Sequence, residues 1–217
     1  MASRLKAGRS RAVLSTDTIA EAAHRLTLEQ PTTPLTLARL GAELGADPTA
    51  LYRHYRSRDE LLLDLADRIY SGPNAAFRHD DDWRRSLTQF ALSMRSELLR
   101  RPALVAEVGS RFTGGPHERR AMEIQREILR RAGFDEDVVN VQTRALGSMG
   151  VSHAVMTASL MTLPESARDI DVAIAHEIHG DEEGYDSREY EQMSFTIILD
   201  TYLDGLSARL GRQQGAS

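Results

Sequence analysis

Residues 36–58 read TLARLGAELGADPTALYRHYRSR, and this stretch predicts two short helices joined by a tight turn. Thr36 offers an N-cap hydroxyl to the first helix, and Gly45 is the residue type that most often ends one. Asp47 then caps the second helix, with Pro48 at its first position, where a missing N–H costs nothing. Such a pair is a helix-turn-helix, in which the first helix braces a second one that fits the major groove of DNA.

The two sides of this helix pair differ in chemistry. Leucines at positions 37, 40, 44 and 51 form the side that is expected to be buried. The other side of the second helix presents Thr49, Ala50, Tyr52, Arg53 and His54. Their methyl groups, rings and hydrogen-bond donors suit base edges and phosphates. Helix N-termini also bind phosphate through free N–H groups, so Thr36 and Thr49 are expected beside the DNA backbone.

The flanking residues complete a small helical head. A helix is predicted over about residues 16–28, because its apolar residues fall on one face at spacings of three and four. Ser57-Arg58-Asp59-Glu60 has the form of a capping box and predicts the start of a fourth helix. Gly72-Pro73 is expected to stop or bend that helix.

The remainder of the chain predicts further helices and no strand, because no segment alternates strictly between apolar and polar residues. The expected helices span about residues 82–98, 102–112, 117–132, 135–161, 166–179 and 187–210. The predicted fold is therefore all-α, with about nine to ten helices. We expect an N-terminal arm and head over residues 1–72 and a second helical domain over residues 73–217.

Charge is distributed unevenly along the chain. The net charge is −5, but residues 1–60 hold nine Lys/Arg against seven Asp/Glu, whereas residues 61–217 hold eighteen against twenty-five. A basic head before an acidic bulk still permits phosphate contacts at the head. There is no cysteine, no secretory signal pattern and no apolar run of membrane-spanning length, so we expect a cytoplasmic protein.

Residues 44–62, LGADPTALYRHYRSRDELL, resemble the recognition-helix signature of the tetracycline-repressor (TetR) family of transcriptional regulators. The matching positions are Leu51, Tyr52, His54, Tyr55, Arg58 and Leu62. The sequence-specific match covers about residues 13–70, and the rest agrees in length and helical character.

The resemblance implies roles for individual residues. It places Tyr52, His54, Arg56 and Arg58 on the sugar-phosphate backbone. It places Thr49, Ala50 and Arg53 nearest the bases, where an arginine binds guanine bidentately. The basic arm of residues 4–11 adds phosphate contacts. We also expect Tyr55 to be mostly buried.

The function implied is that of a ligand-responsive DNA-binding regulator, a repressor released from its operator by a small molecule. It acts as a homodimer on a near-palindromic stretch of double-stranded DNA. It needs no cofactor and no membrane. We find no catalytic constellation, and so predict that the chain is not an enzyme. The alternative is a helical small-molecule- or metal-binding enzyme with a helix-turn-helix-like bracing pair.

Candidate residues in the second domain follow from side-chain type. An apolar effector pocket is predicted to use Phe90, Met94, Phe112, Met122, Met149 and His153, with ordinary core packing as the alternative. A dimer interface is predicted to use Gly147, Val151, Ala154, Ala158, Phe195, Ile198, Tyr202 and Leu206, with packing inside one chain as the alternative. His176 and His179 have a spacing that suits a metal ion, but we favour a solvated acidic face and predict no metal site.

Overall fold

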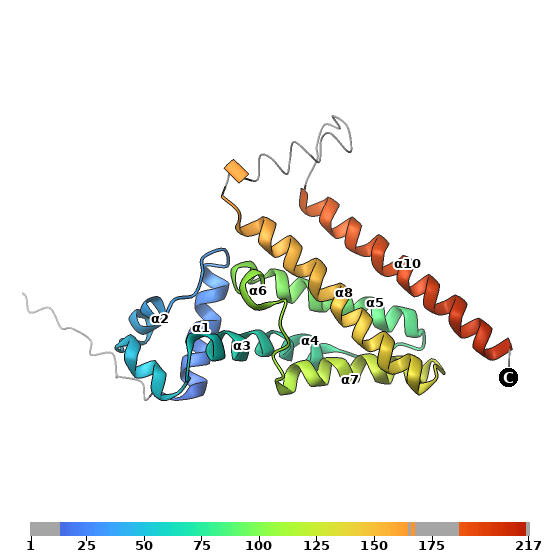
Figure 1. The fold of residues 1–217 in the computed structure, drawn as a ribbon, viewed down its shortest axis with the longest axis horizontal. Helices are drawn as coiled ribbons and strands as arrows, with labels where there is room; N and C mark the ends of the chain where they lie inside the picture. The colour runs from blue at the N-terminus through green and yellow to red at the C-terminus, as the bar shows by residue number, and fades with distance from the viewer. Residues whose placement is uncertain (1–13, 165, 168–186, 216–217) are drawn as a thin grey trace, which may run out of the picture.

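The computed structural model describes residues 14–164, 166–167 and 187–215 of the chain (Figure 1). The ordered elements in these ranges are all helices, which confirms the all-α prediction. Within the same ranges, no helix combines the length and the apolar character that crossing a bilayer demands. The arm of residues 4–11, the predicted helix beyond residue 167, and His176 and His179 lie outside the described residues.

The head consists of four short elements, and each is preceded by a residue whose side chain caps it. They are α1 (Thr16–Glu29), α2 (Leu37–Leu44), η1 (Pro48–Arg53) and α3 (Arg58–Ile69). The Thr36 side chain accepts the N–H of Arg39 at the start of α2. Gly45 ends α2 with a φ of 61°, a left-handed conformation that favours glycine. Both predicted boundaries of α2 are therefore confirmed.

The second helix of the pair is a 3₁₀-helix rather than an α-helix. Asp47 caps it and Pro48 begins it, as predicted, but it spans only six residues. The N–H of Ala50 donates to the carbonyl of Asp47, and that of His54 donates to Leu51, both three residues back. So short a segment gains little from α-helical bonding, and 3₁₀ turns are the usual form of such pieces.

Six further helices make up the body behind the head. They are α4 (Ser71–Ala76), α5 (Trp83–Leu99), α6 (Pro102–Val108), α7 (Pro116–Arg131), α8 (Glu136–Thr162) and α10 (Ser187–Gly215). The helix expected to stop or bend at Gly72-Pro73 ends earlier, at Ile69, and both residues lie inside the short helix α4 that follows Tyr70. The predicted helix 102–112 instead ends at Val108. Gly109 packs so closely on Val105 and Val155 that an added Cβ would lie 2.5 Å from the Val105 carbonyl oxygen.

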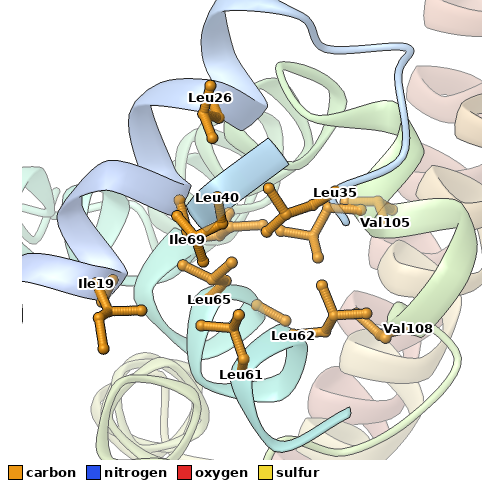
Figure 2. Close-up of a cluster of buried hydrophobic side chains, with 14 of the residues drawn as sticks. Ile19, Leu26, Leu35, Leu40, Leu61, Leu62, Leu65, Ile69, Val105 and Val108 are labelled. Carbon is orange, nitrogen blue, oxygen red and sulfur yellow. The ribbon is translucent and has the colours of Figure 1, made fainter. Parts of the chain in front are cut away.

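The hydrophobic core of the head is continuous with the body. One buried cluster joins the apolar side chains of α1, α2, η1 and α3 to Leu104, Val105 and Val108 of α6 and to Ala154 and Ala158 of α8. Figure 2 shows Val108 beside Leu62 of α3 and Val105 beside Leu35. A second cluster fills the space among α5, α7, α8 and α10. The head and α6 are therefore in direct contact through packed side chains.

Candidate nucleic-acid interface and cavity

The exposed side of η1 presents the side chains that the sequence predicts for DNA contact. Tyr52 is 52% exposed, although a tyrosine ring is usually packed, and Arg53 and Thr49 are exposed as well. Ala50 and His54 are half-buried. Beneath them Leu51 is fully buried in the head. The short element thus presents one polar face outward on a fixed apolar base.

Asp47 and Thr49 are bound to each other at the start of η1. The Thr49 backbone N–H and hydroxyl both donate to Asp47 Oδ1, at 2.7 and 2.6 Å. These bonds lower the pKa of the Asp47 carboxyl, because they stabilise its charged form. Since the Thr49 hydroxyl already gives its hydrogen to Asp47, this residue offers DNA its methyl group and acceptor lone pairs.

Tyr55 supports the reading element from inside. It is buried, as predicted, and its hydroxyl donates to Asp64 Oδ2 at 2.7 Å and to the Thr16 carbonyl at 3.4 Å. Burial, followed by the Asp64 hydrogen bond, raises the pKa of this phenol. Tyr55, two residues after the end of η1, is therefore bonded to both α1 and α3.

The arginines that follow η1 have different surroundings. Arg56 is exposed, and its backbone N–H donates to Glu60 Oε2 at 2.6 Å. Arg58 is half-buried, and it donates to the Leu35 carbonyl at 2.7 and 3.0 Å while pairing with Glu107 of α6. The resemblance implied that Arg58 contacts phosphate. In the structure its N–H donors instead bind the Leu35 carbonyl and Glu107. Arg53 and Arg56 are the exposed cations of this surface.

A cavity of about 300 Å³ lies in the body among α5, α7, α8 and α10. This volume is at the lower end of the range for small-molecule sites. Its apolar lining includes Leu87, Phe90, Met94, Leu98, Met122, Leu146, Met149, Phe195 and Leu199. Its polar lining includes Tyr70, Arg95, Arg111, Glu118, Gln125, Thr143 and Arg144. The arrangement is that of a ligand site, mostly apolar with a few placed polar groups.

Three buried polar atoms at this cavity have no hydrogen-bond partner among the described residues. They are Arg95 Nε, Gln125 Oε1 and Thr143 Oγ1. Buried polar groups are nearly always satisfied, so these three atoms are available to a bound molecule or to water. The sequence did not single out these residues, because each stands alone in an amphipathic helix and nothing local marks it.

The cavity wall is tied directly to the head. Arg111 pairs with Asp59 in the first turn of α3. Glu118 accepts the Gly114 N–H and the Thr113 hydroxyl, while its own N–H donates to Asp67 of α3 at 2.8 Å. Two lining residues thus contact α3, which follows the reading element.

Most of the predicted effector residues meet at one place. Phe90, Met94, Phe112, Met122 and Met149 all line the cavity. His153 does not line it, because its ring is buried against Phe195 with 5.2 Å between ring centroids. Burial and then nearby Arg95 lower the pKa of His153.

The predicted interface residues divide into three groups. Ala154, Ala158, Phe195 and Leu206 are buried inside the chain, where their small or apolar side chains complete the two cores. Gly147 and Val151 line the cavity. Tyr202 is half-buried and donates to Gln142, so of the set only Ile198 is exposed. For the buried residues the structure supports the alternative, packing within one chain.

Comparisons with known proteins agree with this arrangement. Residues 19–65 match the family described as bacterial regulatory proteins, tetR family. The chain is 34% identical over 166 residues to the tetracycline repressor protein class A from transposon 1721 of Escherichia coli, spanning 73% of this chain and 70% of that protein. It is 29% identical to an HTH-type transcriptional regulator of Saccharopolyspora erythraea, and this match spans only 55% of that relative.

Solved structures extend the likeness to nearly the whole chain. A putative transcriptional regulator from Streptomyces coelicolor A3(2) superposes with a TM-score of 0.72 at 29% identity, covering 91% of this chain and 98% of that one. ActR of Streptomyces coelicolor, solved in complex with (S)-DNPA, superposes with a TM-score of 0.66 at 23% identity, covering 89% and 99%. The second likeness concerns the fold alone.

Proposed function

Because the chain belongs to the TetR family of bacterial regulatory proteins, we propose that it is a transcriptional repressor that a small molecule releases from operator DNA. The observation that carries this proposal is the connection between two sites in one chain. An exposed reading face on η1 and a mostly apolar cavity in the body are joined by the contacts of Arg111 and Glu118 with α3. The relative from transposon 1721 is named a repressor, and ActR was solved with a small molecule.

The protein acts as a homodimer that places two heads on a near-palindromic site. One short reading element supplies few contacts, and two heads on a two-fold axis multiply them. Apolar side chains exposed on α8 and α10, including Met156, Met193 and Ile197, support this assembly. With DNA as its partner, the protein functions in the cytoplasm.

Release requires an effector that binds the conformation with the released spacing of the two heads more tightly than the conformation that fits DNA. A ligand with equal affinity for the DNA-bound and released states shifts nothing. An occupant that displaces Arg111 or Glu118 moves α3, and with it the two heads.

The enzyme alternative gains no support from the site. The relatives are transcriptional regulators. The described residues hold no group of three or more side chains suited to a metal ion. We therefore propose a regulator without catalytic activity and without a required cofactor.

The test is a mobility shift with DNA from upstream of its own reading frame, repeated at several salt concentrations. We expect tight binding that weakens steeply with salt and falls at least tenfold in Tyr52→Ala and Arg53→Ala. Arg120→Ala is the matched control, because this exposed arginine of α7 pairs with Glu127 in the body. Binding that equals binding to random DNA, both here and in a genome-wide selection of fragments, would contradict the proposal.

A further inference from the structure

We propose that the effector is a largely apolar molecule with one anionic group, and that Arg95 binds that group. This inference rests on the proposed function, because it assigns a ligand class to the cavity of the repressor. Its evidence is the charge, burial and incomplete hydrogen bonding of Arg95.

Arg95 lies in α5, lines the cavity and is only 6% exposed. Its Nη1 donates to Gln192 Oε1 at 2.8 Å, and its Nη2 donates to the Glu191 carbonyl at 3.3 Å. The guanidinium lies 5.2 Å from the centroid of the Phe195 ring. Its Nε has no acceptor among the described residues, and neither of its two direct acceptors is a carboxylate. Both groups that bond Arg95 directly are neutral, and the Glu191 carboxylate acts on it only from a distance, so the positive charge is buried without a directly bonded counter-ion.

The chain treats its other deeply buried arginine differently. Arg101 is 1% exposed and pairs with the Glu97 carboxylate at 3.0 Å. Burying a cation costs free energy, and a paired carboxylate normally offsets part of that cost. Burial lowers the pKa of Arg95, which reflects the same cost. An anion bound in the cavity supplies the missing counter-charge.

The other charges near the cavity do not serve this purpose. Arg111 is paired with Asp59, and Glu118 is bonded to Thr113 and Gly114. The Glu191 carboxylate accepts the Thr157 hydroxyl at 2.7 Å and lies 3.9 Å from His153 Nε2, so it faces these two side chains and acts on Arg95 only from a distance. Arg144 also lines the cavity, but it is exposed and its guanidinium lies over the Phe112 ring, 4.4 Å from the centroid. Arg95 is therefore the buried cation of the cavity wall that has no directly bonded carboxylate.

The other two unpaired atoms indicate which further polar groups the ligand carries. Gln125 Oε1 is an acceptor and calls for a donor, while the Thr143 hydroxyl offers either role. The rest of the wall is apolar and the volume is about 300 Å³. The matching chemistry is a compact ring system with a carboxylate or another acidic oxygen for Arg95, and a hydroxyl for Gln125.

The test uses three probes of one shape: anthracene-2-carboxylate, anthracene-2-carboxamide and 2-aminomethylanthracene. Their fluorescence is titrated with the full-length protein at pH 7.5. We expect the carboxylate to bind at least tenfold more tightly than the amide, and the ammonium probe to bind more weakly still. Charge-assisted bonds to a buried arginine favour the anion.

Variants assign the preference to one residue. Arg95→Met is expected to bring carboxylate and amide within twofold of each other, and Arg95→Lys to retain part of the preference, because it keeps the charge without the Nε donor. Arg84→Met is the matched control, since Arg84 also lies in α5 and binds α10, through Asp204 and Ser207, but does not line the cavity. Its tenfold preference is expected to persist.

Several outcomes would overturn the assignment of Arg95. They are wild-type protein that binds the amide as tightly as the carboxylate, no carboxylate binding at all, and a preference that survives Arg95→Met. The wild-type comparison decides even where a variant fails to fold. Operator binding is measured separately, without probes. If the wild type binds DNA but shows no preference for the carboxylate, only the assignment of Arg95 is wrong. If the wild type does not bind DNA, the proposed repressor function is wrong.

Discussion

At the scale of single residues, a buried arginine connects the head to the body. Arg101, at the start of α6, donates to His24 Nε2 of α1 at 2.7 Å and to Glu97 Oε1 of α5 at 3.0 Å. Because arginine has no acceptor, His24 must be neutral at this nitrogen to accept the bond. Burial first, and the Arg101 charge second, lower the pKa of His24 below its ordinary value of 6.5.

This histidine makes stability depend on pH. The unfolded chain takes up a proton at His24 before the folded chain does, so the free energy of unfolding falls as pH drops below about 6.5. Urea denaturation at pH 7.5 and 5.5 is expected to show a smaller loss for His24→Gln than for the wild type. The pKa of His153 is also lowered, so His153 adds to the stability lost at low pH. The free energy of unfolding should therefore change still less with pH in the double variant His24→Gln, His153→Gln. An unchanged loss in His24→Gln would contradict this account.

A second residue-scale contact lies at the start of α7. Gly115 is the N-cap of α7 and has no side chain to cap it, and Asp67 of α3 takes that role by accepting the N–H groups of His117 and Glu118 at 3.2 and 2.8 Å. A Cβ on Gly115 would lie 2.1 Å from Asp67 Cγ. Gly115→Ala is therefore expected to destabilise the protein by about 1–3 kcal/mol.

Thermal unfolding tests this expectation against Gly72→Ala. Gly72 is exposed in α4, and a Cβ there meets no atom within 4 Å. Alanine is the better helix former, so the control should be neutral or slightly stabilising. Equal melting temperatures for the two variants would rule out the close approach.

At the scale of elements, α3 is attached to α6 by a charged contact at its first residue. Arg58 binds the Leu35 carbonyl and Glu107 at once, and so fixes the segment between η1 and α3. The pair is about one-third exposed on each side, so its own contribution to stability is small. We therefore expect its effect to be positional, because it holds the segment that follows η1 against α6 and the Leu35 carbonyl.

The salt dependence of DNA binding separates positioning from phosphate contact. Arg56→Met is expected to reduce the slope of log K against log salt by about one, as loss of a phosphate contact does. Arg58→Met is expected to weaken binding at every salt concentration with the slope unchanged. A slope change of one for Arg58→Met would restore the phosphate role that the sequence resemblance implied.

Local signals explain what the sequence predicted about these elements. The caps at Thr36, Gly45 and Asp47 are contacts within a few residues, and all three are confirmed. The Ser57 box is confirmed in part: Ser57 caps Glu60, but the Glu60 side chain binds the N–H of Arg56 instead of that of Ser57.

Long-range contacts explain what the sequence left out. Asp67 and Glu118 are 51 positions apart, and Arg95 and Gln192 are 97 apart, so no local pattern signals either contact. For Ala154 and Ala158 of α8 the sequence left open whether they meet a second copy or another helix of the same chain. Which helix they meet depends on the whole fold, and both residues pack in the core that contains α6.

At the scale of the whole molecule, α8 and α10 lie side by side along the body (Figure 1). Their inner faces are buried in the core, whereas Met156, Met193, Ile197 and Ile198 stay 40–58% exposed. Large apolar side chains gathered on one pair of helices favour association. We infer that a second copy covers this surface and thereby sets the distance between the two heads.

Ile197→Glu tests that assembly, because a carboxylate buried in an apolar interface loses its hydration without gaining a partner. Light scattering is expected to give the wild type twice the chain mass of 24.2 kDa and the variant the chain mass itself. Operator affinity should fall by at least a hundredfold, since two linked heads bind far more tightly than one. Ala38→Glu adds the same charge at an exposed position of α2 and should remain dimeric. If Ile197→Glu combined with Met193→Glu still has the doubled mass, the copies meet elsewhere, and the spacing of the heads must be set by another surface.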